Sequence, residues 1–407
     1  MTKKTKKQPK LRFSKFADDW EQRKFSEGVS EIGDGLHGTP TYCEAGNVYF
    51  INGNNLVDGK IAISAETKKV NERQQSTADK SLDDTTILMS INGTIGNLAY
   101  YSGERLMLGK SAAYIKVSEF DKRFVYAYLQ APSARRYFMD SLTGTTIKNL
   151  GLKAIREMIM CIPQDANEQK RIGKFFDYLD HLIAFRQREL DELKELKQGM
   201  LQKMFPKNGA DVPEIRFPEF TDAWEQRKLG DITEFVTGKS FSSELLDDGS
   251  YTVMDMGAVS QEGHRIETKR TNTYRDMLRK DDLIMPKDDI GGGLIIGRTA
   301  YIPCDNKFVL GDHVYRLRFS NENGLFVHYQ INSHGFRKQI LPLVTGSAQL
   351  GLNSKSIQGV YIRIPSYSEQ VKIGSYFQNL DNLIALQQKE LDGYKELKKG
   401  LLQQMFC

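Results

Sequence analysis

The chain contains two copies of one plan, and this duplication restricts its possible folds more than any other feature. LRFSKFADDWEQRK occupies residues 11–24, and a close copy, IRFPEFTDAWEQRK, occupies residues 215–228. Within both copies WEQRK is unchanged, and the two copies hold both tryptophans of the chain. The offset of 204 residues is far longer than the roughly 20 to 50 residues of a solenoid repeat. It therefore predicts two duplicated domains.

A second repeat lies near the end of each half. Residues 168–205 and 369–406 are identical at 23 of 38 positions, whereas the stretches before them have diverged much further. The offset is 201 residues at this second repeat, so the two halves are nearly equal in length. Each half is thus a variable block followed by a similar segment.

Both repeated segments are predicted to be helices, because they lack Pro and are rich in Leu, Lys, Glu and Gln. Apolar residues three and four positions apart form one stripe on each helix, as in a coiled-coil seam. At 1.5 Å per residue each helix would be roughly 57 Å long. We expect the two stripes to pack together as a spacer between globular blocks. The alternative is that each helix folds against its own half. The stripe residues expected to pair are Ile172, Leu179, Leu182, Leu193, Met200, Ile373, Leu380, Leu383, Leu397 and Leu401.

The variable blocks are predicted to be mixed α/β with many short strands, which makes the fold class α+β with two tandem globular domains. Apolar stretches that end at Pro163 and Pro365 are typical of a last strand before each helix. Pro and Gly in residues 206–214, PKNGADVPE, predict a linker that stops the first helix. Because the N-terminal tail and this linker lead into the same motif, we expect the termini to lie close together.

These features divide the chain into six expected parts. They are a basic tail (1–10), a first block (11–163), a first spacer helix (164–205), the linker (206–214), a second block (215–365) and a second spacer helix (366–406).

Composition excludes several classes of protein. The mean hydropathy is −0.48 and no apolar run approaches the length of a membrane-spanning helix. The four cysteines are far apart and form no CxxC, so neither a zinc knuckle nor a disulfide framework is indicated. The net charge is +5, and five lysines in the first ten residues account for it. The sequence therefore predicts a reduced, cytoplasmic protein whose nucleic-acid contacts come from local patches.

One pattern in each half is typical of metal-dependent nucleases. Glu66 and Lys68 follow Asp58, and Glu267 and Lys269 follow Asp255, in the order acid, acid-x-Lys. Nucleases use such residues to hold Mg²⁺ and activate water. Because basic residues surround both glutamates, a basic surface loop is the preferred interpretation, and a self-sufficient nuclease is the alternative.

The remaining polar segments suit the reading of double-stranded DNA. Residues 60–80 and 264–280 occupy matching places in the two halves and are rich in Lys, Arg, Asn and Gln. Arg and Lys suit guanine edges, Asn and Gln suit adenine, and Ser and Thr suit phosphates. A solvated charged face is the alternative interpretation. The candidate DNA-contact residues are Lys68, Lys69, Arg73, Gln74, Thr145, Thr146, Lys148, Lys269, Arg270, Arg275, Arg279 and Ser347.

As a whole, from about residue 11 to its end, the chain resembles the specificity subunit of type I restriction–modification enzymes. The resemblance rests on the doubled WEQRK, on the loop GDGLHGTP at 33–40 and on ILMSINGTIG at 87–96. It also rests on two Ile-Pro…Glu-Gln…Ile junctions, at 162–172 and 364–373. The second half has VTGKSF at 236–241 instead of the Gly-Asp-Gly-x-His pattern, so the role of His37 stays open.

The resemblance implies that each variable block is a target recognition domain for one half of a bipartite, asymmetric DNA site. It implies that the helices form an antiparallel coiled coil with pseudo-two-fold, circular symmetry. The helices would fix the distance between half-sites and dock two modification (methyltransferase) subunits. Those partners would carry S-adenosylmethionine, a separate restriction (motor) subunit would use ATP and Mg²⁺, and this chain would bind no cofactor or metal. It would have no catalytic residue. A coiled-coil adaptor without a DNA role is the second alternative.

Overall fold

A computed structural model describes residues 8–146, 148–207, 209–347 and 349–407 of the chain. The chain forms two compact units. Unit 1 contains residues 1–188 and 388–407, and unit 2 contains residues 189–387. Each unit mixes short strands with helices, as the sequence predicts.

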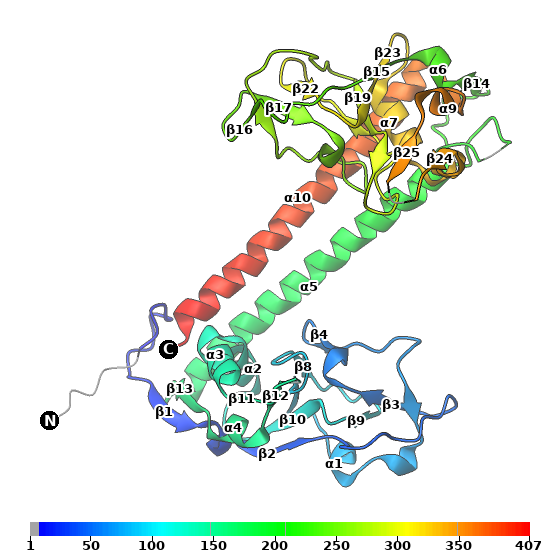
Figure 1. The fold of residues 1–407 in the computed structure, drawn as a ribbon. Coiled ribbons are helices and arrows are strands. Elements are labelled where there is room, and N and C mark those ends of the chain that lie inside the picture. The colour runs from blue at the N-terminus through cyan, green and yellow to red at the C-terminus, as the bar shows by residue number, and fades with distance from the viewer. Residues whose placement is uncertain (1–7, 147, 208, 348) are drawn as a thin grey trace. The chain divides into compact units, whose positions relative to one another are not determined.

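Unit 1 carries short strands and four short helices before the first long helix (Figure 1). The strands are β1 (Glu21–Lys24), β2 (Val29–Asp34), β3 (Val48–Ile51), β4 (Leu56–Val57), β5 (Lys60–Ile61), β6 (Lys69–Val70), β7 (Thr86–Ser90), β8 (Leu98–Tyr100), β9 (Leu106–Leu108), β10 (Ala112–Val117), β11 (Leu142–Thr143), β12 (Asn149–Leu150) and β13 (Ile159–Ile162). The helices are α1 (Thr77–Lys80), α2 (Lys122–Gln130), α3 (Pro132–Asp140) and α4 (Leu152–Glu157).

Unit 2 repeats this order of elements with small changes. Its strands are β14 (Glu225–Lys228), β15 (Thr233–Thr237), β16 (Leu245–Leu246), β17 (Tyr251–Met254), β18 (Arg270–Thr271), β19 (Leu283–Pro286), β20 (Asp288–Asp289), β21 (Ala300–Tyr301), β22 (Phe308–Leu310), β23 (Val314–Phe319), β24 (Val344–Thr345), β25 (Leu350–Leu352) and β26 (Tyr361–Ile364). Its short helices are α6 (Leu229–Ile232), α7 (Gly324–Asn332), α8 (His334–Ile340) and α9 (Ser354–Gln358). The long helices are α5 (Ala166–Lys203) and α10 (Tyr367–Met405).

The two units share one sheet frame. The order β2-β10-β7-β8 in unit 1 corresponds to β15-β23-β19-β21 in unit 2. A second sheet, β6-β3-β9, corresponds to β18-β17-β22, and in both the last pair is parallel. Strands β7 and β19 are buried along their whole length, because helices or other strands cover both faces of these apolar runs. Sequence divergence has therefore left the backbone frame intact.

The repeated WEQRK motif forms an antiparallel strand pair in each unit. Strand β1 pairs with β13, and β14 pairs with β26, with Glu21 opposite Ile162 and Glu225 opposite Ile364. Both predicted last strands are thus confirmed. The tryptophan that begins each motif is buried, so the motif fixes the start of each block to its end.

A salt bridge closes the same junction in both units. In unit 1, Arg12 donates from Nε and Nη2 to the two carboxylate oxygens of Glu168, at 2.6 and 2.8 Å. In unit 2, Arg216 donates in the same way to Glu369, at 2.7 and 2.8 Å. Both carboxylates are buried, and the bidentate geometry satisfies both oxygens of each.

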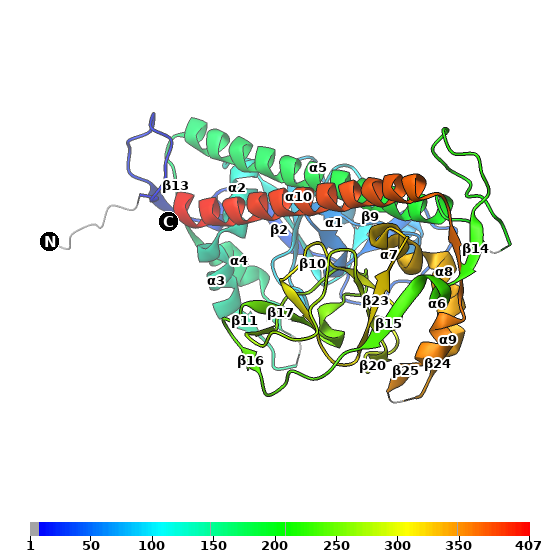
Figure 2. The ribbon, with the colours of Figure 1, turned by 90° about the horizontal axis from the view of Figure 1, so that it is seen from above.

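In unit 1, the first turns of α5 lie beside the last turns of α10 (Figures 1 and 2). The rings of Phe176 and Phe406 stack with centroids 5.6 Å apart. Farther along α5, Asp180 forms an ion pair with Lys398. Because the contact moves forward along α5 and backward along α10, the two segments are antiparallel.

Unit 2 contains the same contacts with the two helices exchanged. The rings of Phe205 and Phe377 stack at 5.9 Å, and Lys197 forms an ion pair with Asp381. The offset of 201 residues between the second repeats converts each unit 1 pair into its unit 2 counterpart. The antiparallel pairing and the circular symmetry are thus confirmed in each unit. The alternative, in which each helix folds only against its own half, is wrong.

The start of the described chain and the end of the linker are also equivalent. The backbone N–H of Leu11 donates to the carbonyl of Gln404 at 2.9 Å, and that of Ile215 donates to Lys203 at 3.0 Å. The N-terminal segment therefore passes beside the end of α10 in unit 1, which agrees with the expectation that the termini lie close together. In the part of the chain that the structure describes, no helix is both long enough and apolar enough to cross a membrane.

Candidate nucleic-acid interface

Four loops of unit 1 meet at one end of the β2-β10-β7-β8 sheet, and we call them loop cluster 1. They are residues 35–40 after β2, 91–97 between β7 and β8, 109–111 between β9 and β10, and 144–148 between β11 and β12, of which residue 147 lies outside the described part. Backbone bonds from Leu36 to Leu108 (2.7 Å) and from Lys110 to Leu36 (2.9 Å) join two of the loops. Asn92 connects a third, because its side-chain amide donates to the carbonyl of Lys110 at 3.2 Å.

Three of these loops, together with residues 149–152, line a cavity of about 240 Å³. Its polar lining includes Asp34, His37, Asn92, Lys110 and Asn149. His37 is exposed, and its Nε2 lies 2.8 Å from Oδ2 of Asp34. Amides, an ammonium and an imidazole around an open cavity can donate hydrogen bonds to base edges and to phosphates.

Glycine is required at the end of the GDG motif (33–35), where the backbone of this motif lies against the backbone of β9. A Cβ on Gly35 would lie 2.0 Å from the carbonyl oxygen of Leu108, and a Cβ on Gly238 would lie 1.7 Å from that of Gly311. Gly238 therefore occupies in unit 2 the place of Gly35 in unit 1. The sequence signal for loop cluster 1 was this glycine-rich motif, although sequence reasoning assigned no DNA role to His37, Asn92 or Lys110.

The corresponding loops of unit 2 form loop cluster 2. They are residues 238–241 after β15, 287–299 between β19 and β21 (with the short strand β20 near their start), 311–313 between β22 and β23, and 346–349 between β24 and β25, of which residue 348 is not described. Here His313 Nδ1 lies 2.7 Å from Oδ2 of Asp288, and Lys287 lies 3.4 Å from the same oxygen. Both clusters thus carry a histidine–aspartate pair, but from different residues. The frame is shared, whereas the side chains that it presents are not.

In the predicted basic segment 60–80 of unit 1, some candidate side chains bind other parts of the unit and others do not. Gln74 donates to the carbonyl of Thr41 at 2.8 Å and accepts from its N–H at 2.9 Å, so this amide holds the loop. The ammonium of Lys69 lies 5.5 Å from the ring centre of Tyr49. Lys68 and Arg73 are exposed, and within the described residues their side chains have no hydrogen bond or ion pair. These two cations are available for phosphates.

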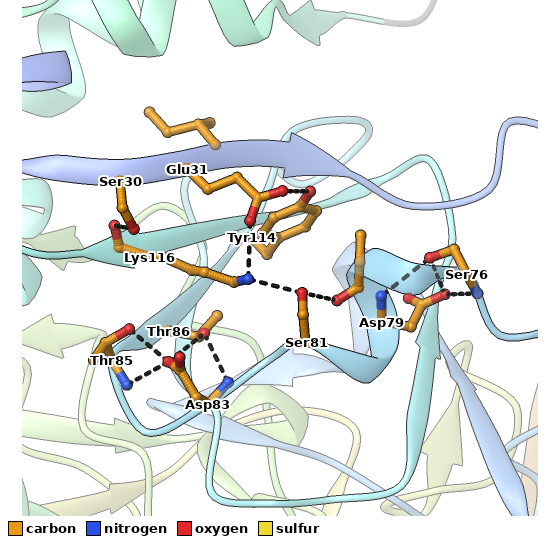
Figure 3. A network of polar contacts seen from close by, with 12 residues as sticks. Ser30, Glu31, Ser76, Asp79, Ser81, Asp83, Thr85, Thr86, Tyr114 and Lys116 are labelled. Atoms are coloured by element: carbon orange, nitrogen blue, oxygen red, sulfur yellow. Dashed lines mark hydrogen bonds and ion pairs between the residues drawn. The ribbon is translucent and has the colours of Figure 1, made fainter.

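The end of this segment is fixed to the sheet by a polar network (Figure 3). Ser76 and Asp79 cap α1 reciprocally, and Asp79 also accepts from the N–H of Leu108 at 2.9 Å. Lys116 donates to Ser81 at 2.8 Å and pairs with Glu31 at 2.9 Å. Residues 76–81 are therefore structural.

The same network shifts two pKa values. The hydrogen bond from Lys116 lowers the pKa of Glu31, and a second hydrogen bond from Tyr114 adds to this effect. Burial, together with the hydrogen bond to Glu31, raises the pKa of Tyr114 to about 12. The network therefore keeps a charged carboxylate and a neutral phenol at neutral pH.

In unit 2 the predicted basic residues are mostly engaged by their own fold. Lys269 forms an ion pair with Asp255, and Arg270 donates to the carbonyl of Gly249 at 2.7 Å. Arg275 lies 3.1 Å from Glu244 and stacks over Phe241 at 4.1 Å. Only the fourth candidate, Arg279, is exposed and has no side-chain partner among the described residues.

The hairpin candidates belong to the loop clusters. Thr145, Thr146 and Lys148 are exposed in loop cluster 1, and Ser347 is exposed in loop cluster 2. The β11–β12 hairpin that carries the first three residues reaches the His37 cavity only through Asn149. A role in DNA contact stays a prediction for all four residues.

The acidic pattern does not form a metal site. Glu66 accepts a hydrogen bond from Ser64 at 2.8 Å, and Glu267 lies 3.0 Å from Arg265 and 3.5 Å from Lys307. Over residues 8–146, 148–207, 209–347 and 349–407, no three His, Cys, Asp or Glu side chains are grouped to hold a metal ion.

The predicted stripe residues of the helices fall into two groups. Ile172, Leu179, Ile373 and Leu380 are buried in the cores of their units, and Met200 and Leu401 pack against those cores. Leu182 and Leu193 are half-buried, whereas Leu383 and Leu397 are exposed. Only some of the stripe residues are therefore buried by packing. The others leave part of each helix with aliphatic side chains exposed to solvent.

Comparison with known proteins identifies the family. The model of a family described as "Type I restriction modification DNA specificity domain" matches residues 17–195 and 221–394. The MjaVIII specificity subunit, from a type I restriction enzyme of Methanocaldococcus jannaschii, is 25% identical over 317 residues, which are 73% of this chain and 74% of that protein. These matches give no support to a nuclease or to an adaptor without a DNA role.

Two solved structures share the fold. A type I restriction–modification S subunit from M. genitalium aligns with a TM-score of 0.66 at 17% identity, over 98% of this chain and 99% of that one. A structure from work on complex assembly and conformational transition of the type I restriction–modification system aligns with a TM-score of 0.53 at 15% identity, over 94% and 96%. The chain therefore belongs to the type I restriction–modification DNA specificity family, as a non-catalytic specificity subunit with two tandem target recognition domains that binds DNA and associates with other subunits of its complex.

Proposed function

We propose that the two units read the two halves of a bipartite, asymmetric DNA site through loop clusters 1 and 2. The observation that carries this proposal is a shared sheet frame whose loops present different side chains in the two units. A shared frame gives both units the same way of approaching DNA, and different loops give them different base preferences. In this proposal residues 11–163 and 215–365 are the recognition domains, and residues 164–205 and 366–406 are spacer helices joined by the linker 206–214.

Phosphate contacts would come from the cations that the fold leaves free. In unit 1 these are Lys68, Arg73, Lys110 and Lys148, and in unit 2 Arg279 is the matching candidate. Replacing Arg73 with Ala should weaken binding to all sequences alike and reduce the salt slope by about one. If Arg73→Ala leaves affinity and salt slope unchanged in a band-shift titration, Arg73 does not contact DNA.

Arg275 requires a different test, because it also holds the fold of unit 2 through Glu244 and Phe241. Arg275→Ala should lower thermal stability as well as affinity. Arg275→Lys keeps the charge and separates the two effects. If Arg275→Ala binds DNA as the wild type does, Arg275 is purely structural.

The exposed part of the helices would dock two modification subunits, one on each unit. Phe185 and Leu397 of unit 1 are each about half exposed, and so are Leu386 and Leu196 of unit 2. The offset of 201 residues relates Phe185 to Leu386 and Leu196 to Leu397. Because both units present apolar side chains at equivalent positions, they can accept two copies of one partner.

The chemistry would reside in the partners. In this proposal the modification subunits bind S-adenosylmethionine and methylate an adenine in each half-site, and restriction (motor) subunits that join the complex use ATP and Mg²⁺. The chain itself binds no cofactor. Because the complex would act on chromosomal DNA, we expect this chain to be cytoplasmic.

Mapping methylated adenines in cells that carry this chain and its modification subunit tests the proposal. We expect methylation at one asymmetric sequence made of two short blocks with a fixed gap. Methylation at single, unsplit sites would overturn the two-reader proposal. Incubation of the purified chain with DNA and Mg²⁺ provides the second arm, and cleavage by the chain alone would restore the nuclease alternative.

A further inference from the structure

Loop cluster 2 contains an apolar loop that unit 1 lacks. Between the equivalent strands, unit 2 has residues 287–299 where unit 1 has only residues 91–97. The side chains of Ile290 and Leu294 are 72% and 50% exposed at this loop. Two aliphatic side chains that a glycine-rich loop, IGGGLIIG, presents to water need an explanation.

The loop is held in place by buried charged groups. Asp289 is 2% exposed, and its carboxylate accepts from the backbone N–H groups of Gly291 at 2.5 Å and Ile295 at 3.0 Å. Arg337, which is also buried, donates to the carbonyls of Ile296 at 2.9 Å and Gly293 at 3.4 Å. These bonds fix the loop from both sides.

The bracing shows that the exposure of the aliphatic side chains is not a result of disorder. Ile296 of the same loop is fully buried, so the loop already contributes one side chain to the core. The fold nevertheless keeps Ile290 and Leu294 outside. A loop that is rigid before binding loses little conformational entropy when it meets a ligand.

The acids at the base of the loop are paired or hydrogen-bonded within the fold. Asp288 pairs with His313 and Lys287, and the carboxylate of Asp289 is bonded to backbone amides. Asp289 is buried and Asp288 has a lysine partner, so neither acid presents an exposed, unpaired carboxylate to a phosphate backbone. Ser347, on the β24–β25 hairpin of the same cluster, is exposed and polar.

We propose that Ile290 and Leu294 read bases by apolar contact with thymine methyl groups in the major groove of the half-site bound by unit 2. The thymine methyl is the apolar group that base pairs present in that groove, and aliphatic side chains contact it. This inference rests on the proposed function, because it assumes that loop cluster 2 faces DNA. It adds a chemical difference between the units. Loop cluster 1 presents mainly polar groups beside the exposed Leu36, whereas loop cluster 2 adds the two aliphatic side chains of its longer, hydrogen-bonded loop to its own histidine–aspartate pair.

A protein partner is a weaker explanation for this tip. A subunit that docks on both units needs the same surface on both, as the helices provide. The apolar loop occurs in one unit only, which suits a ligand that differs between the units. The two half-sites of an asymmetric DNA target are such a ligand.

The test uses the complex of the full chain with its modification subunit. Methylation is mapped for the wild type, for Ile290→Ala/Leu294→Ala and for the control Val212→Ala. Val212 is an exposed aliphatic residue of unit 2, and it lies in the linker. We expect the double variant to lose discrimination about tenfold at one or two positions of one half-site. The other half-site should stay unchanged, and the control should match the wild type.

A second arm removes the methyl groups from the DNA. Replacing thymine by uracil in that half-site should weaken binding of the wild type but leave binding of the double variant unchanged, because both changes delete the same contact. If uracil weakens DNA binding by both proteins equally, or by neither, the proposal of a thymine contact is wrong. If the double variant keeps its methylation pattern or loses its modification subunit instead, the loop does not read DNA. A wild type without any split site would refute the proposed function itself.

Discussion

At the scale of single residues, each block is joined to its helix by one buried ion pair. Glu168 is buried beneath Arg12, and Trp20 adds an N–H contact at 3.4 Å. We expect Arg12→Met to reduce the stability of unit 1 by about 3 to 5 kcal/mol, because it leaves the carboxylate buried and unpaired. Urea unfolding of the full chain measures the effect, and Arg216→Met should do the same in unit 2.

Two further variants test the reason for this loss. Arg12→Met/Glu168→Gln removes the unpaired charge and should recover part of the stability. Arg23→Met breaks the exposed pair with Glu27 and should change stability little. If Arg12→Met and Arg23→Met behave alike, burial of the Glu168 charge is not the cause.

Unit 2 also contains a histidine that the fold keeps neutral. Burial lowers the pKa of His328 to about 3, and the nearby positive charge of Lys197 adds to the effect. His328 contacts Thr299 and Asn332, at 3.1 and 3.2 Å. The unfolded chain binds a proton below about pH 6.5, whereas the folded chain does so only near pH 3. The free energy of unfolding of unit 2 should therefore decrease as the pH is lowered from about 6.5 to 3, by at most about 1.4 kcal/mol per pH unit.

The measurement needs a signal from unit 2 alone. Trp20→Phe leaves Trp224 as the sole tryptophan, and its fluorescence reports urea unfolding of unit 2 between pH 7 and 4. His328→Gln should flatten the pH dependence, except for a smaller contribution from His264, whose pKa burial also lowers. An unchanged slope in His328→Gln would show that other groups control acid stability.

At the scale of elements, the helices carry two kinds of apolar position. Phe185 and Leu386 lie nine residues after the stacked Phe176 and Phe377, one in each unit. If these exposed residues dock modification subunits, Phe185→Gln should remove one copy from the complex and Leu386→Gln the other. Native mass spectrometry should then show one partner per chain in each single variant and none in the double variant.

The repeat itself supplies the control for this experiment. Tyr178 is an exposed aromatic residue of α5, and the equivalent residue of α10 is Asn379. Tyr178→Asn should therefore keep both partners. Loss of a partner in Tyr178→Asn, or retention of both in the Phe185→Gln/Leu386→Gln double variant, would contradict the proposed docking surface.

The sequence predicted local elements well and their long-range arrangement only in part. Helices α5 and α10 and strands β13 and β26 followed from periodicity and from proline positions, which depend on neighbouring residues. The pairing of β1 with β13 joins residues far apart in the chain, and no local pattern indicates such a partner.

The candidate site was harder to predict for the same reason. Residue type made Gln74, Lys269 and Arg275 candidates for DNA contact, but the fold gives these side chains structural partners. Conversely, Asn92 and Lys110 became candidates only when folding brought them to one cavity with His37. Residue type indicates what a side chain can bind, and only the fold shows whether it is free to do so.

At the scale of the whole molecule, each long helix belongs to both units. The division falls between Arg188 and Glu189 in α5 and between Gln387 and Gln388 in α10. Four residues inserted at both places add about 6 Å of helix and leave the contacts within each unit in place. If the helices set the gap of a split DNA site, methylation mapping should show both half-sequences unchanged and a gap about two base pairs longer. Altered half-sequences would contradict this role.

The matching junctions of the two units bear on how this protein is inherited. Each reading block is bounded by the same antiparallel pair of first and last strands, the same arginine–glutamate bridge and the same helix start. A foreign block with these ends would therefore meet surfaces that already fit it. Recombination within the repeated codons would then exchange one block for another in a single step. The host could acquire a new methylation pattern without any compensating substitution in the helices or in the partner enzymes.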